Sequence, residues 1–150
     1  MKTILIATLV LTGCTGEALY VCSDNVFAEV RYSEPVDCAY SRSVTEAAKK
    51  AVIESGLWTH PDLKSTVLVV RPVTQWYDGY WDATAEGMQT PGRIDVGSNY
   101  SGLVHEMFHA KDYLEFDLPR LLAPLHFGWD TDGRFAADVK WCDKMTGRRQ

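Results

Sequence analysis

A His-Glu-x-x-His pattern is the feature of this sequence that most directly indicates chemistry. It reads His105-Glu106-Met107-Phe108-His109. On a helix that turns about 100° per residue, the two histidines lie about 40° apart on one face, one turn from each other. Both imidazoles can then bind one metal ion, with Glu106 beside them as a general base. The pattern therefore predicts a site for Zn2+, with Glu106 as its catalytic carboxylate.

A catalytic zinc ion takes a third protein ligand and leaves a fourth position for water. His126 follows His109 after a proline-containing connection that can return the chain to the cleft, and we take it as the third ligand. Asp130 and Asp132 are rival ligands, because carboxylates also bind zinc and both lie close behind His126. His60, beside a proline, fits a surface histidine better. The sequence leaves the choice between His126 and Asp130 open.

The two histidine motifs together resemble those of SprT/Spartan-like zincins. In that family, His-Glu-x-x-His is followed after a turn by a third His near a Gly and an aromatic residue, as His126 is here by Gly128 and Trp129. The resemblance covers roughly residues 94–135. It implies a small HExxH zinc metallopeptidase, a minimal zincin. The longer metzincin pattern is absent, because Asp112 stands in the place of its Gly and Glu115 in the place of its third His.

Charge narrows the choice of substrate. The chain has 15 Lys plus Arg against 20 Asp plus Glu, a formal charge of -5, so no basic surface for nucleic acid is expected. The SprT/Spartan-like family acts on DNA-bound proteins, and we therefore carry over its metal ligands and not its substrate. We expect a peptide or protein substrate. The alternatives are an amide bond of the cell wall, or a non-catalytic zinc-containing envelope lipoprotein with a structural or binding role.

The N-terminus has the pattern of an export signal. A short basic start precedes an apolar run, Ile4 to Leu11, far below the roughly 20 residues that cross a bilayer as a helix. The run ends at Leu11-Thr12-Gly13-Cys14, which resembles a bacterial lipobox. We expect residues 1–13 to be a lipoprotein signal peptide and Cys14 to carry lipid in the bacterial cell envelope. Thr15 resembles an outer-membrane address in enteric bacteria, and the choice of membrane stays open.

Three further cysteines, Cys22, Cys38 and Cys142, lie beyond Cys14. An exported protein meets an oxidising compartment, so two of these are expected to form a disulfide. Closing a short loop has the lowest entropic cost, which favours Cys22 with Cys38, although the other pairings are open. None of the cysteines lies in a motif of an activated thiolate or in the close pairs typical of zinc sites.

An α+β domain is expected over residues 43–150, after a lead-in segment. Residues 14–42 are polar and interrupted, and we expect a lipid anchor, a tether and an irregular lead-in segment. Ser43 begins a capping box and an apolar face of helical spacing that ends at Gly56. Thr66 to Arg71 is a β-branched run between prolines, typical of a strand inside a sheet.

The next elements lead to the motif. Asp78-Gly79, between the pairs Trp76-Tyr77 and Tyr80-Trp81, predicts a hairpin turn. Arg93 to Val96 predicts a strand, which we expect at the sheet edge, where it could pair with an extended substrate. The active-site helix should run from about Ser101 to Glu115, before Pro119, and a helical segment should end the chain.

Overall fold

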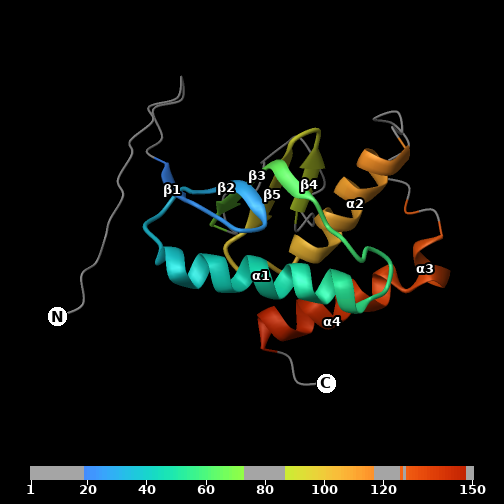
Figure 1. The fold of residues 1–150 in the computed structure, drawn as a ribbon. Helices are drawn as coiled ribbons and strands as arrows, with labels where there is room; N and C mark the ends of the chain where they lie inside the picture. Colours follow the sequence, from blue (N-terminus) through green and yellow to red (C-terminus); the bar gives the residue numbers. More distant parts are fainter. Residues whose placement is uncertain (1–18, 73–86, 117–125, 127, 148–150) are drawn as a thin grey trace, which may run out of the picture.

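A mixed five-stranded sheet forms the centre of the structure, a computed structural model that describes residues 19–72, 87–116, 126 and 128–147 (Figure 1). Its spatial order is β1-β2-β3-β5-β4. The middle three strands are parallel, and each outer strand is antiparallel to its neighbour. The strands are β1 (Tyr20–Cys22), β2 (Phe27–Tyr32), β3 (Leu63–Arg71), β4 (Gly87–Thr90) and β5 (Arg93–Gly97).

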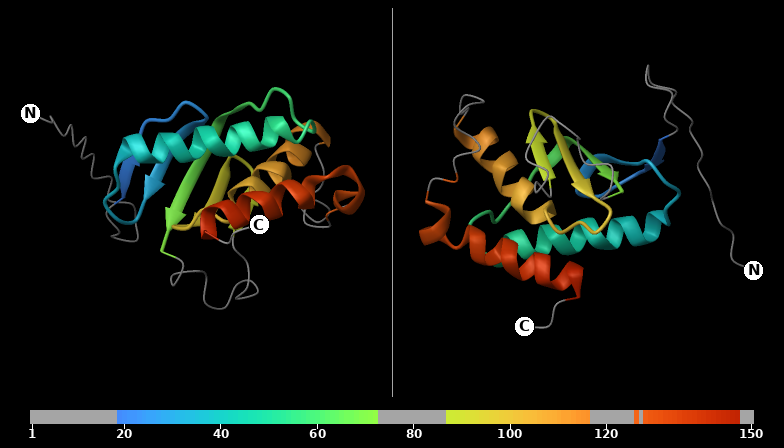
Figure 2. Two further views of the ribbon diagram at one scale, coloured as in Figure 1. Left: turned by 90° about the horizontal axis from the view of Figure 1, so that it is seen from below. Right: turned by 180° about the vertical axis from the view of Figure 1, so that it is seen from behind.

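Helices pack on one side of this sheet. They are α1 (Cys38–Glu54), α2 (Leu103–Phe116), α3 (Trp129–Asp132) and α4 (Arg134–Thr146). Figure 2 shows α1, α2 and α4 grouped together, with α4 running alongside α1. The described part of the chain is thus mixed α+β, as the sequence predicts, with an N-terminal helix, a sheet, the helix of the histidine motif and a C-terminal helical segment.

The core lies between the sheet and the helices. Because side chains alternate along a strand, the same face recurs every second residue. The register aligns two buried rows across the three parallel strands, Val30-Leu68-Ile94 and Tyr32-Val70-Val96. Val44, Ala48 and Val52, at helical spacing on α1, join the same cluster. This apolar layer holds α2 against the sheet and so fixes the helix that carries the histidine motif.

The helix α1 begins five residues before the predicted start at Ser43. Its N-cap is Asp37, whose side chain accepts a hydrogen bond from the Ala39 backbone N–H at 2.9 Å. Ser43 lies inside the helix, where its hydroxyl donates to the carbonyl of Tyr40. The capping-box pattern was therefore not the helix start, because an aspartate further upstream caps the same apolar face. The predicted end is right: Ser55 is the C-cap and Gly56 follows with φ +77°.

The prediction of an irregular segment before residue 43 is wrong for two stretches. Residues 20–22 and 27–32 form β1 and β2, which pair with each other and connect the N-terminal part to β3. The disulfide Cys22–Cys38, the pairing that loop closure favours, links the end of β1 to the start of α1. Cys142 lies half-buried on α4.

The prediction of a sheet-edge position for Arg93 to Val96 is also wrong. This strand, β5, lies between β3 and β4, so the outer strand next to the histidine motif is β4. The four residues of β4, Gly-Met-Gln-Thr, have no alternating or β-branched pattern that predicts a strand. The predicted hairpin with its four aromatic residues, 76–81, lies outside the described residues, as does Cys14. No helix in the described ranges has the length and apolar character needed to span a membrane.

Candidate metal centre

The histidine motif lies in the first two turns of α2. An Asx turn precedes it, in which the Asn99 side chain accepts a hydrogen bond from the Ser101 backbone N–H at 3.3 Å. One side of the helix is fully buried against the sheet: Leu103, Val104, Met107 and Phe108 have no exposed surface. The other side carries the two histidines of the motif. The apolar side thus fixes the rotation of the helix, and with it the direction of the imidazoles.

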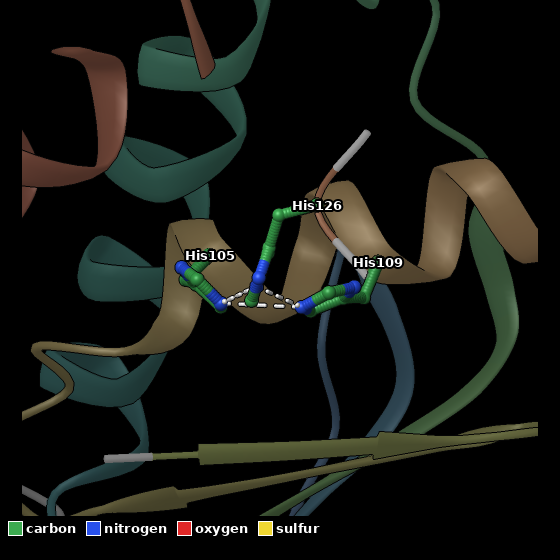
Figure 3. Close-up of side chains that lie close together, drawn as sticks. All are labelled: His105, His109 and His126. Carbon is green, nitrogen blue, oxygen red and sulfur yellow. Dashed lines mark hydrogen bonds between the residues drawn. The ribbon is translucent and has the colours of Figure 1, made fainter. Parts of the chain in front are cut away.

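Three imidazole nitrogens meet in one place. The Nε2 atoms of His105 and His109 are 3.1 Å apart, and each is 3.0 Å from Nε2 of His126 (Figure 3). His105 and His109 come from successive turns of α2, and His126 reaches them from the segment before α3. His126 lies 17 residues after His109 in the sequence, and the fold returns it to α2. The structure brings together the three histidines that the sequence predicts as ligands.

This triangle fits a metal ion. An imidazole Nε2 either bears a hydrogen or offers a lone pair, and three rings pointing at a common centre cannot all satisfy one another by hydrogen bonds. With bonds of about 2.0–2.1 Å to zinc and near-tetrahedral angles, neighbouring ligand nitrogens lie about 3.3 Å apart, a few tenths of an ångström beyond the spacing here. Three neutral imidazoles are also a donor set that zinc, copper, iron and nickel accept. His105, His109 and His126 could therefore hold one metal ion.

A carboxylate partners the outer nitrogen of one histidine. The Nδ1 atom of His105 lies 3.0 Å from Oδ2 of Asp138, on α4. An ionised carboxylate can only accept a hydrogen bond, so this contact favours the tautomer in which Nδ1 carries the hydrogen and Nε2 offers its lone pair. Both side chains are largely shielded, with exposed fractions of 22% for His105 and 20% for Asp138.

Trp129 forms the wall behind the three imidazoles. Its ring centroid lies 4.9 Å from that of His105 and 4.6 Å from those of His109 and His126. Only 1% of Trp129 is exposed. Phe135 packs 5.5 Å from both Trp129 and His126. The aromatic wall excludes water from the back of the cluster. Burial, together with the neighbouring His105, lowers the pKa of His126 and so favours the neutral form that binds metals.

A polar cluster anchors this wall to α2. Asp112, one turn beyond His109, accepts a hydrogen bond from the Trp129 indole N–H at 3.2 Å and is ion-paired with Arg134. Arg134 also donates to Asp132 at 2.6 Å, and its guanidinium lies over the Trp129 ring. Asp112 thus ties both α3 and the start of α4 to α2, the helix that carries the histidine motif.

Glu106 is buried against the outer strand β4, with 5% of its surface exposed. A Cβ added at Gly87 would lie 2.6 Å from Cγ and 2.9 Å from Oε1 of Glu106, so only glycine permits this approach. Burial raises the pKa of Glu106 to about 7; His105 and a hydrogen bond from the Gln89 backbone lower it, whereas Asp138 and Asp95 raise it. A buried carboxyl whose pKa lies near neutrality can both take up and release a proton.

The rival ligands lie outside the cluster. Asp130 is exposed, and Asp132 is engaged by Arg134. Within the described residues, the group that could hold a metal ion consists of the three histidines. The fourth histidine, His60, is exposed, as predicted. Tyr100, just before α2, is buried in the core, and its hydroxyl shares a hydrogen bond with that of Tyr32.

Sequence reasoning missed four residues of this site. Asp138, Asp112 and Arg134 are ordinary charged residues with no local pattern, and their roles arise only when α4 packs beside α2. Gly87 is likewise defined by a contact that no local pattern encodes. Trp129 had a weak signal as the aromatic residue near His126. Comparisons of the chain with protein-family models, curated proteins and solved structures gave no match.

Proposed function

We propose that the chain is a zinc-dependent hydrolase, a minimal zincin that cleaves peptide bonds, with His105, His109 and His126 as zinc ligands and Glu106 as general base. The observation that carries the proposal is the triangle of three Nε2 atoms at 3.0–3.1 Å. Further support comes from the buried carboxylate that directly follows the first ligand, and from a ligand set of three, which leaves a coordination position for water.

Each residue of the site has a separate role in the proposed hydrolysis. Bound zinc supplies Lewis acidity and lowers the pKa of a water ligand to about 7. Glu106 takes the proton from the attacking water and later delivers it to the leaving amine. Trp129 and Phe135 keep bulk water from the back of the site, so that charges at its centre are poorly screened. Gly87 leaves the space in which the Glu106 side chain lies.

The Glu106→Gln variant tests the mechanism. Glutamine keeps the size of the side chain but cannot accept the proton, so zinc binding should persist while hydrolysis of fluorescein-labelled casein falls at least 100-fold. Glu54→Gln, at an exposed site on α1, is the matched control and should retain full activity. Unchanged hydrolysis in Glu106→Gln would refute the role of Glu106.

The alternative is a non-catalytic zinc-containing envelope lipoprotein. A structural zinc site is closed by a fourth protein ligand. Among the described residues no fourth side chain joins the histidines, which favours the catalytic role. A parent chain that binds zinc but hydrolyses neither casein nor cell-wall amides would support the alternative.

We also propose that the protein is lipid-anchored through Cys14 in a bacterial envelope, on the strength of the lipobox-like Leu11-Thr12-Gly13-Cys14. Cys14→Ser should move the chain from the membrane fraction to a soluble or unprocessed form. Unchanged membrane retention, with no lipid on Cys14 by mass spectrometry, would contradict this.

A further inference from the structure

We infer that Asp138 is the positioning residue of the metal centre and that it selects the tautomer in which His105 binds the ion. The inference rests on the proposed metal site and deepens it. Asp138 does not touch the triangle of nitrogens. It acts through His105, whose Nδ1 it contacts at 3.0 Å.

The tautomer matters because imidazole has two nitrogens of similar basicity. Free histidine places its hydrogen on either one, and only the Nδ1–H form presents an Nε2 lone pair. In this chain, Nε2 of His105 is the atom that meets His109 and His126. A carboxylate that accepts from Nδ1 removes the competing tautomer before a metal ion arrives. It also increases the electron density on the ligating nitrogen, as carboxylates behind metal-bound histidines do.

The geometry makes the contact specific. His105 stands in the first turns of α2 and Asp138 in the second turn of α4, so their contact forms only where these two helices pack. Asp138 and His105 are both mostly shielded from solvent, so the charge-assisted hydrogen bond is poorly screened by water. Phe135, three residues before Asp138 on α4, packs on the same site and limits the freedom of the His105 ring.

The placement also distinguishes Asp138 from the other carboxylates near the cluster. Asp112 and Asp132 are held by Arg134, and Asp130 faces solvent. Asp138 therefore has a role that the sequence did not reveal: α4 supplies no ligand, yet it determines how a ligand of α2 is presented.

The test compares Asp138→Ala, Asp138→Asn and the control Asp130→Ala in the full chain. Zinc affinity is measured by competition with a chromophoric chelator. Asp138→Ala should bind zinc 10- to 100-fold more weakly, on the scale typical of such outer partners. Asp138→Asn keeps an oxygen that accepts from Nδ1 and should recover part of the loss. Asp130→Ala should bind as the parent does.

A second readout separates positioning from general damage. Nitrogen-15 NMR of the imidazoles in the metal-free chain should show His105 as the Nδ1–H tautomer in the parent and in Asp138→Asn, and a mixture in Asp138→Ala. Circular dichroism melting verifies that each variant is folded; if Asp138→Ala is not, the comparison of Asp138→Asn with the parent decides.

The outcomes are distinct. Parental zinc affinity and an unchanged His105 tautomer in folded Asp138→Ala would overturn the inference while leaving the three-histidine site intact. A parent that binds no zinc overturns the proposed function, and the metal-free NMR comparison then decides separately whether Asp138 controls the His105 tautomer.

Discussion

Two contacts each close a loop of nearly equal length, and we call them closures: one is covalent and the other is not. The disulfide Cys22–Cys38 joins residues separated by 16 positions and links β1 to α1. The contact between His109 and His126 spans 17 positions and links α2 to the segment before α3. The first is a covalent bond between two sulfur atoms, which leaves neither as a free thiol. The second is a non-covalent contact that, together with His105, brings three imidazole Nε2 atoms to within 3.0–3.1 Å of one another.

Of the two closures, the one made by the histidines could bind a metal ion and so support catalysis. The disulfide stabilises mainly by restricting the unfolded chain and has no free valence. A metal ion at the histidines would restrict the chain in the same way and also offer an open position to water. The surroundings differ as well: Cys22 belongs to the apolar core, whereas His105 contacts the carboxylate of Asp138, and the Asp112–Arg134 pair holds Trp129 behind the histidines.

Breaking the histidine closure should have the largest effect. In the parent, zinc at 1,000 times its dissociation constant should add about 4 kcal/mol to the free energy of unfolding, or about 10 °C in Tm. His126→Ala removes one of three ligands and should abolish that shift. His60→Ala, which removes the exposed histidine, should keep it. Calorimetry with and without zinc measures the shift, and an equal shift in His126→Ala would exclude His126 as a ligand.

Breaking the disulfide should lower the free energy of unfolding somewhat less and should leave zinc binding unchanged. For a loop of this length, the double variant Cys22→Ser/Cys38→Ser should lose about 3 kcal/mol of unfolding free energy. Its zinc affinity should match that of the parent, since β1 lies at the opposite edge of the sheet from β4, the strand that α2 contacts most. Cys142→Ser is the control. Urea unfolding and chelator competition check both statements, and weakened zinc binding in the folded double variant would show that the two closures are coupled.

The smallest effect should come from Gly87→Ala, which alters the space around Glu106 and leaves all three ligands in place. The added Cβ overlaps Glu106, so strain of about 1–2 kcal/mol should lower the rate of hydrolysis about tenfold with unchanged zinc affinity.

A double-variant cycle shows whether this effect passes through Glu106. If it does, Gly87→Ala should cause no further loss in a chain that already carries Glu106→Gln. Additive losses would mean that Gly87 acts elsewhere.

The sequence predicted the parts of this molecule that local patterns encode. Helical spacing identified α2 and its two histidines, and β-branched composition identified β3. The predictions were wrong where an interaction with a residue or strand outside the local pattern determined the structure. Asp37, not Ser43, caps α1, and β4 rather than β5 is the outer strand. The short runs that form β1 and β2 lie between polar residues and were not predicted as strands, because pairing with each other and with β3 is what makes them strands.

In the candidate site, too, some residues could be predicted from local patterns and others depend on how the elements pack. His126 could be selected from chemical type and its distance along the chain, whereas Asp138, Arg134 and Gly87 could not. Their roles depend on which helix or strand packs beside α2, and no periodicity within one segment encodes that neighbour.

The most direct test of the three-histidine metal centre is elemental mass spectrometry of the purified full chain after exposure to zinc and removal of the excess. We predict one zinc ion per chain in the parent and in His60→Ala, and none in His126→Ala. A folded parent that retains no zinc, or a His126→Ala chain that retains as much as the parent, would contradict the three-histidine metal centre.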